Sequence, residues 1–252
     1  MTVHETLPAA GVLWLTIDEP AKRNALTVEV MAALAAGLAR LAGEDHLRVG
    51  VLTGAGQVFC AGGDTSRMGG QRPTPWQRRD YLDGGVGRLA RQLLHLDKPL
   101  IAAVNGPAVG AGMDLALWCD FRFAAPAAYL RAGFVDLALV PGFGSAWLLP
   151  RLIGPARALE ILLTGERVTA EQAQALGIYR SVSDRYEAEA LALAATLAGK
   201  PAPAVRATKR LVQRALTTGV LDHLELAWSQ FGLLQETPEH ITAVEKMRNR
   251  KR

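Results

Sequence analysis

Short apolar runs bounded by turn residues recur through the first two thirds of the chain. Residues 12–17, 50–54 and 101–104 are apolar, partly β-branched and of strand length, which favours buried β-strands. Residues 3–7 precede the first run across a Pro- and Gly-containing turn at 8–11, which predicts a β-hairpin. Additional short strands are expected at residues 121–124, 128–130 and 134–140.

Helical patterns alternate with these strands and then replace them. Thr27 is expected to cap a helix that extends to about Ala42, and more helices are predicted at residues 86–96, 113–118, 155–163 and 169–176. From Tyr186 onward the remaining sequence is typical of helices alone, at residues 186–198, 202–217, 221–234 and 238–248. The pattern predicts an α/β fold of stacked ββα turns in residues 1–185, followed by a helical segment, 186–252.

Composition narrows the class of protein. Half of the 252 residues are hydrophobic and 21% are charged, enough for a large core, and the net charge of +4 suits a small phosphorylated ligand without implying nucleic acid. Cys60 and Cys119 both end apolar runs and are expected to be buried free thiols. No metal-ligand spacing, secretion signal or uninterrupted membrane-length apolar run is present, so a cytoplasmic protein without a metal site is expected.

Two small-residue turns follow predicted strands. Residues 101–104 lead through Asn105-Gly106-Pro107 into Gly110-Ala111-Gly112 and a helix, and residues 50–54 are followed by Phe59-Cys60-Ala61-Gly62-Gly63-Asp64. Small residues let a ligand approach the backbone closely, and the start of a helix offers unpaired N–H groups. One N–H from each turn, aimed at the same oxygen, would form an oxyanion hole.

At these turns the chain resembles the crotonase superfamily, the enoyl-CoA hydratase/isomerase family, and the resemblance runs from about Leu13 to about Arg248. The motifs that carry it are N-A-L at 24–26, F-C-A-G-G-D at 59–64, A-V-N-G-P-A-V-G-A-G-M-D at 103–114, P-G-F-G-S at 141–145, L-P-R-L-I-G at 149–154 and L-T-G-E-R-V-T-A-E-Q-A-Q-A-L-G-I at 163–178.

The resemblance implies the family's spiral core, a coenzyme A thioester as substrate and no permanently bound cofactor. The N–H groups of Gly63 and Ala111 match the family's two oxyanion donors. The positions that match its coenzyme A loop and adjoining turn are Lys22, Arg23, Ala25, Ala61 and Asp64. Lys22 and Arg23 would lie beside the phosphates, although solvated loop charges are an equal alternative. The helical segment would pack on neighbouring subunits in a homotrimer or a hexamer.

The variable segment 65–83 matches the part of the family that covers the acyl pocket. Met68, Trp76 and Tyr81 are candidate lining residues, and a mobile surface loop is the alternative interpretation.

The acids depart from the hydratase pattern. Hydratases of the family hold a water between two glutamates; Asp114 occupies the first position and Phe134, which has no proton to give, occupies the second. Asp136, two residues along the expected strand, would reach the site only if the loop moved. Some relatives have an acid directly after Pro141, where this chain has Gly142.

A single carboxylate is enough for a double-bond shift, because it can remove a proton and return it elsewhere. The sequence therefore favours isomerase-type proton shuttling by Asp114 over hydration. Another CoA-thioester lyase or hydrolase, and a non-catalytic acyl-CoA binding protein, are the alternatives. Nucleic acid is not the expected ligand, because no aromatic and basic stripe is evident.

Overall fold

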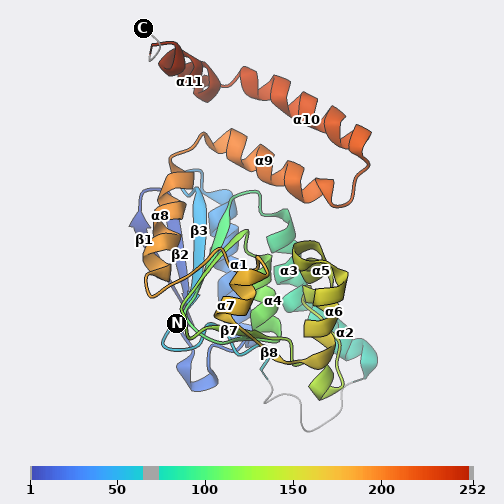
Figure 1. The fold of residues 1–252 in the computed structure, drawn as a ribbon. Helices are drawn as coiled ribbons and strands as arrows, with labels where there is room; N and C mark the ends of the chain where they lie inside the picture. The colour runs from blue at the N-terminus through green and yellow to red at the C-terminus, as the bar shows by residue number, and fades with distance from the viewer. Residues whose placement is uncertain (1, 65–73, 250–252) are drawn as a thin grey trace.

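In the part of the chain that the computed structural model describes, residues 2–64 and 74–249, six strands form the main sheet in the order β1-β2-β3-β4-β6-β9 (Figure 1). These strands are β1 (Val3–Ala9), β2 (Val12–Ile17), β3 (Val49–Gly54), β4 (Leu100–Val104), β6 (Phe121–Ala124) and β9 (Ser181–Val182). β1 and β2 form the predicted antiparallel hairpin, and every later neighbour is parallel. The carboxyl ends of β3 and β4 therefore lie at one edge.

The main sheet is buried on both faces, which explains its continuous apolar runs. Leu100, Ala102 and Val104 of β4 face one core cluster, and the alternate residues Ile101 and Ala103 face the other. On the first face lie α1 (Val28–Gly43) and α3 (Val86–His95), and α8 (Tyr186–Ala198) covers the second. Such double coverage is the usual environment of parallel strands.

A smaller sheet of three strands, β5-β7-β8, lies beside the first, again within the described residues. Its strands are β5 (Ala108–Val109), β7 (Tyr129–Arg131) and β8 (Arg167–Thr169). Helices α4 (Ala111–Trp118) and α7 (Ala170–Ala175) contact this sheet, α5 (Ser145–Ile153) packs on α4, and α6 (Pro155–Thr164) packs on α5. The short 3₁₀ helices η1 (Pro20–Lys22) and η3 (Val135–Leu137) lie in loops, and α2 (Pro75–Gly84) follows the undescribed segment. Strands, helices and C-terminal helices together confirm the predicted α/β class.

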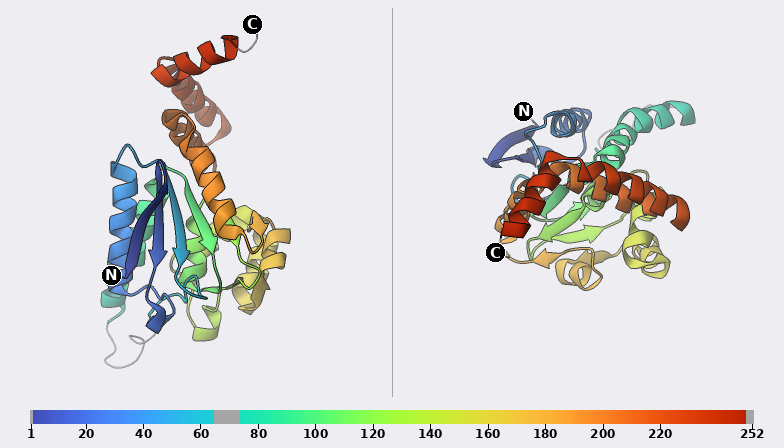
Figure 2. Two further views of the ribbon diagram at one scale, coloured as in Figure 1. Left: turned by 90° about the vertical axis from the view of Figure 1, so that its left-hand side faces the viewer. Right: turned by 90° about the horizontal axis from the view of Figure 1, so that it is seen from above.

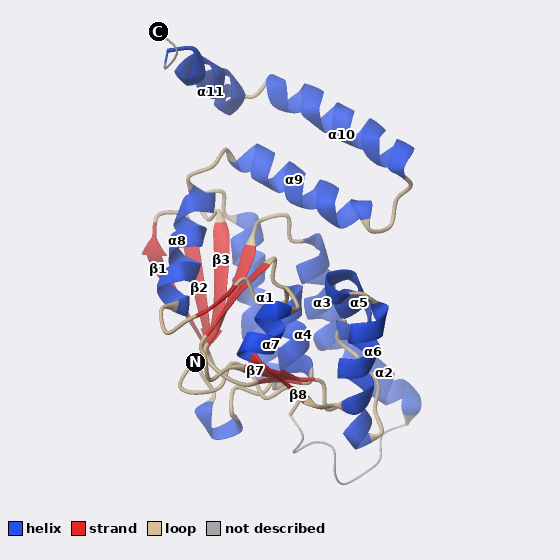
Figure 3. Cartoon of the chain, in the orientation of Figure 1, coloured by secondary structure: helices blue, strands red, loops and turns tan. Residues whose placement is uncertain are grey.

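The helical end divides into two parts. α8 packs on the main sheet, although the sequence placed residue 186 at the start of a separate segment. α9 (Ala202–Ala215), α10 (Val220–Gln235) and α11 (Pro238–Asn249) project from the body, as the shared view of Figures 1 and 3 and the left view of Figure 2 show. Lys209 anchors α9 through Asp120, at 2.7 Å from Nζ to Oδ2. No helix among the described residues has the length and hydrophobicity to cross a bilayer.

Candidate active site

The two small-residue turns predicted from the sequence lie side by side at the carboxyl edge of the main sheet. The N–H of Val109 donates to the carbonyl of Cys60 at 3.0 Å, and the N–H of Cys60 donates to the carbonyl of Pro107 at 3.2 Å. An isolated parallel bridge joins Cys60 to Ala108. The turns meet because β3 and β4 are parallel neighbours, so the segments that follow them leave at the same edge.

Glycine makes this close approach possible. A Cβ at Gly112 would come within 2.2 Å of the Cys60 carbonyl oxygen, so no side chain fits there. A Cβ at Gly62 would lie 3.4 Å from the Ala111 nitrogen, which places the 62–63 turn directly against the start of α4. Ala111 is the first residue of α4, where N–H groups have no intrahelical acceptor, and Gly63 is exposed with open space beside it.

The N-A-L motif holds a third segment against the same edge. The Asn24 amide donates to the carbonyls of Ala55 and Val58, at 3.0 and 2.6 Å, and its oxygen accepts from the N–H of Glu19. Backbone bonds then link Leu26 to Gly62 and Ala61 to Arg23. Asn24 thus acts as a buried clamp, a role that the motif alone did not reveal.

The candidate coenzyme A residues gather around this clamp. Lys22 donates to Asp64 at 2.9 Å, and this hydrogen bond raises the pKa of Lys22. Arg23 lies on the surface, Ala25 is buried, and Ala61 is half-buried beside Arg23. The structure therefore brings Lys22, Arg23 and Ala25 against the turn at residues 61–64, which contains the other two candidate positions.

Asp114 lies in the first turn of α4 with a fully buried side chain (0% exposed). Neither carboxylate oxygen has a hydrogen-bond partner within the described residues, and the same holds for the Oγ of buried Ser145. Burial raises the pKa of Asp114 to about 6. The nearby Ser145 hydroxyl and the backbone groups of Ser145 and Phe143 limit that rise, although none of them meets hydrogen-bond geometry with the carboxylate. A carboxyl with this pKa can both take up and release a proton near neutral pH.

Phe134 fills the position of the second family acid. Its ring lies 3.9 Å from a Cβ built on Gly110, at the start of α4, so an apolar side chain borders that end of the site. The strand expected at 134–140 is wrong: residues 135–137 form η3, which ends at Ala138 in the left-handed region (φ 54°). These residues are exposed and have no neighbouring strand to pair with among the residues that the structure covers.

Asp136 takes part in a different set of contacts. Its Oδ2 lies 2.9 Å from Nη2 of Arg131, and Nε of Arg131 donates to the carbonyl of Gly165. The Asp136 side chain is 48% exposed. Because residues 135–137 form η3 rather than a strand, the spacing of residues along a strand does not describe where Asp136 lies relative to Phe134.

The candidate acyl-pocket segment is described only from Thr74 onward. Thr74 and Gln77 form a capping box at the start of α2, a helix that the sequence analysis does not predict. Trp76 and Tyr81 lie on this helix and are exposed, and Met68 lies outside the described residues.

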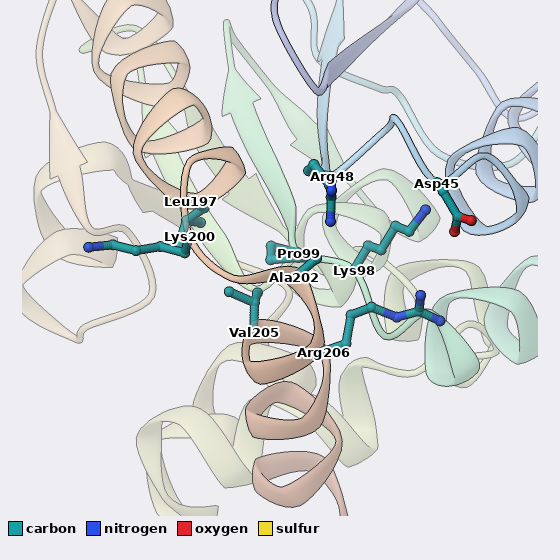
Figure 4. Close-up of a pocket in the computed structure, with 9 residues that line it drawn as sticks. All are labelled: Asp45, Arg48, Lys98, Pro99, Leu197, Lys200, Ala202, Val205 and Arg206. Carbon is teal, nitrogen blue, oxygen red and sulfur yellow. The ribbon is translucent and has the colours of Figure 1, made fainter. Parts of the chain in front are cut away.

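A hollow lies at the opposite edge of the main sheet, where β3 and β4 begin. It is lined by Asp45, Arg48, Lys98, Pro99, Leu197, Lys200, Ala202, Val205 and Arg206 (Figure 4). The buried Lys98 ammonium donates to the carbonyls of Leu41 and Glu44, and Arg206 pairs with Asp97. The charges of Lys98 and Arg206 therefore have protein partners, unlike the carboxyl of Asp114.

Comparisons with known proteins agree with this arrangement. Residues 8–248 match the sequence profile of the family described as Enoyl-CoA hydratase/isomerase. The chain is 41% identical over 211 residues to the probable enoyl-CoA hydratase EchA14 of Mycobacterium tuberculosis, covering 84% of this chain and 81% of that protein. It is 38% identical over 222 residues to the 1,2-epoxyphenylacetyl-CoA isomerase of Escherichia coli, covering 86% and 84%.

Solved structures match the whole fold. A crystal structure of an enoyl-CoA hydratase subunit from Geobacillus kaustophilus superposes with a TM-score of 0.92 at 32% identity, covering 99% of this chain and 96% of that one. The enoyl-CoA hydratase of Bacillus anthracis gives 0.94 at 28% identity, covering 99% and 97%. The fold is thus that of the crotonase-type acyl-CoA enzymes.

The chain belongs to the enoyl-CoA hydratase/isomerase family. Enzymes of this family act on coenzyme A thioesters without a permanently bound cofactor. The resemblance, fold and enzyme class predicted from the sequence are therefore confirmed.

Proposed function

We propose that the protein is an enoyl-CoA isomerase in which Asp114 moves a proton along the acyl chain. The observation that carries this proposal is one buried carboxyl at the start of α4, with Phe134 where a hydratase has its second acid. One relative at 38% identity is itself named 1,2-epoxyphenylacetyl-CoA isomerase, so isomerase chemistry is represented among relatives of this similarity.

In the proposed reaction, ionised Asp114 removes a proton from the α-carbon of a 3-enoyl thioester. The electron pair moves to the carbonyl oxygen, which lies between the N–H groups of Gly63 and Ala111, and each such donor contributes about 3–4 kcal/mol to the transition state. Protonated Asp114 then returns the proton to the γ-carbon, the double bond becomes conjugated with the carbonyl, and the carboxylate is regenerated. In this proposal the side chains of Lys22, Arg23 and Asp64 border the coenzyme A moiety. Ala25 and Ala61 lie in the backbone segments beside it.

The test compares turnover of a 3-enoyl-CoA by wild type and Asp114→Asn. Asn keeps the size of the side chain but cannot accept a proton, so turnover should fall about 100- to 10,000-fold. Affinity for a saturated acyl-CoA, measured by calorimetry, should stay nearly unchanged because the donors and the coenzyme A loop are intact. Equal turnover by the two proteins would remove Asp114 from the mechanism.

The complementary variant is Phe134→Glu, which restores an acid at the second position. It should raise hydration of crotonyl-CoA from a low baseline, with Phe134→Gln as the matched control that adds polarity without a proton. Rapid hydration of crotonyl-CoA by wild type would favour the hydratase alternative. No reaction with any enoyl-CoA would favour an acyl-CoA binding protein.

We further propose that the projecting helices pack on other copies of the chain in a homotrimer or a hexamer. Trp228 and Phe231 of α10 are 65% and 66% exposed, and no residue of α10 is buried. A hollow of about 230 Å³ between α9, α10 and α11 is lined by Phe231, Leu234 and Ala243 among others. Apolar surface of this extent is rarely left uncovered.

Light scattering at micromolar concentration tests this assembly. Wild type should have the mass of three or six chains, and Trp228→Glu should lower it, whereas Trp76→Glu, a change at an equally exposed tryptophan on α2, should not. A monomeric wild type would contradict the proposal.

A further inference from the structure

Helices α4 and α5 pack against each other and place the buried hydroxyl of Ser145 beside the buried carboxyl of Asp114. Ser145 and Asp114 are both 0% exposed. Within residues 2–64 and 74–249, neither the hydroxyl oxygen of Ser145 nor either carboxylate oxygen of Asp114 has a hydrogen-bond partner. Buried polar groups are seldom left unpaired in folded proteins, and here the two adjacent groups are complementary, one a donor and the other an acceptor.

The turn that carries Ser145 is held firmly against α4. The Trp118 indole donates to the carbonyl of Phe143 at 2.6 Å, and its ring stacks on Trp147 with 6.4 Å between centroids. Gly144 has φ 126°, and a Cβ there would lie 3.0 Å from the Trp118 ring, so only glycine lets the turn pack this closely. Ser145 follows as the first residue of α5, and its position is fixed by packing.

We propose that Ser145 is a positioning residue for Asp114, with a hydroxyl that donates a hydrogen bond to the ionised carboxylate. The proposal rests on the function above, in which Asp114 alternates between base and acid. A hydroxyl suits this alternation because it can donate to a carboxylate and, after rotation, accept from the protonated carboxyl. Both states of the proton shuttle then keep the same orientation toward the substrate.

The decisive variant is Ser145→Ala, read by infrared titration of the resting protein. The carbonyl stretch of protonated Asp114 is assigned by its loss in Asp114→Asn. Losing a hydrogen bond to a charged group disfavours the ionised form, so the apparent pKa of Asp114 should rise by about 1. Ser145→Thr, which keeps the hydroxyl, should retain the wild-type value.

Ser183→Ala is the matched control, since the Ser183 hydroxyl donates to Glu189 at 2.6 Å, away from α4 and α5. It should leave the pKa of Asp114 unchanged. Ser145→Cys, a weak donor of similar volume, is measured in parallel so that a folding defect in the alanine variant does not end the test; it should give an intermediate value.

A kinetic measurement separates a positioning role from a structural one. In Ser145→Ala the acidic limb of kcat/KM for a 3-enoyl-CoA should move to higher pH by the same amount, with KM nearly constant. An unchanged pKa of Asp114 in both Ser145→Ala and Ser145→Cys overturns the inference. A shifted pKa in a protein that turns over no enoyl-CoA leaves the inference standing and overturns the proposed function instead.

Discussion

A charged group is buried at each end of helix α4, and the two groups differ in whether protein atoms form hydrogen bonds with them. At the carboxyl end, Arg122 donates to the carbonyls of Leu117, Cys119 and Ile178. At the amino end, the carboxylate of Asp114 has no partner that meets hydrogen-bond geometry in the described chain. Burial lowers the pKa of Arg122 and raises that of Asp114 to about 6.

The difference indicates that Arg122 holds the fold together, whereas Asp114 is available for the proposed proton transfer. Arg122 joins the end of α4 to the segment before β9, and the helix dipole favours a cation there. Asp114 has a favourable dipole too, but its raised pKa corresponds to about 3 kcal/mol of unfavourable free energy in the ionised form. A buried group that costs stability when charged is a candidate for the catalytic role proposed above.

Replacing Arg122 should have the largest effect on stability. Arg122→Met leaves three buried carbonyls without their donor and should lower the free energy of unfolding by about 3–5 kcal/mol. Urea denaturation measures the change. Arg157→Met, which removes an exposed arginine paired with Glu160, is the control and should change stability by about 0.5 kcal/mol or less. Equal losses in the two variants would contradict the contrast.

Replacing Asp114 by a residue that cannot ionise should instead stabilise the protein above about pH 6. The folded-state pKa of Asp114 lies above its ordinary value of 3.8, so the folded state holds the proton more tightly than the unfolded state. The wild-type protein therefore loses stability as pH rises from about 4 to about 6. Asp114→Asn, which cannot ionise, should gain about 3 kcal/mol relative to wild type between pH 4 and pH 8. A pH-independent difference in urea denaturation would show that Asp114 is not desolvated.

Much of this arrangement could be predicted from sequence because it is local or follows from topology. Short local sequence patterns predict the hairpin, the Thr27 cap and the strand–turn–helix unit before Asp114. To predict that the two turns meet, one must also assume that the buried apolar strands before them are parallel neighbours. Counting back from Pro141 also identifies position 134, where this chain has Phe, as the one that matches the second acid of the family.

What sequence could not supply depends on distant contacts or on exposure. Residues 135–140 resemble a strand, yet four of their apolar side chains are exposed and residues 135–137 coil into η3. The capping box at Thr74 and Gln77 was a readable signal for α2 that the Pro- and Gly-rich surroundings obscured. Ser145 stood within a recognised motif, but its position beside Asp114 depends on how α5 packs against α4.

A buried cation outside α4 extends the comparison with a smaller expected effect. Lys98 donates to the carbonyls of Leu41 and Glu44, near the end of α1. Burial and the guanidinium groups of Arg206 and Arg48 lower the pKa of Lys98. Lys98→Met should lower the free energy of unfolding by about 2 kcal/mol, because two carbonyls lose a charged donor. Lys200→Met, a change at an exposed lysine of the same hollow, should have little effect in the same denaturation experiment.

The smallest effect is expected at Asp136, the acid nearest in sequence to the missing glutamate. Its carboxylate pairs with Arg131 at the surface, so Asp136→Asn should change stability by less than about 1 kcal/mol. Turnover of a 3-enoyl-CoA should stay close to that of wild type, because η3 holds the carboxylate against Arg131 rather than beside Phe134. Steady-state kinetics on Asp136→Asn and Asp114→Asn side by side decide the matter. If both variants lose turnover alike, the loop carries Asp136 into the site during catalysis, and the chemistry uses two acids instead of one.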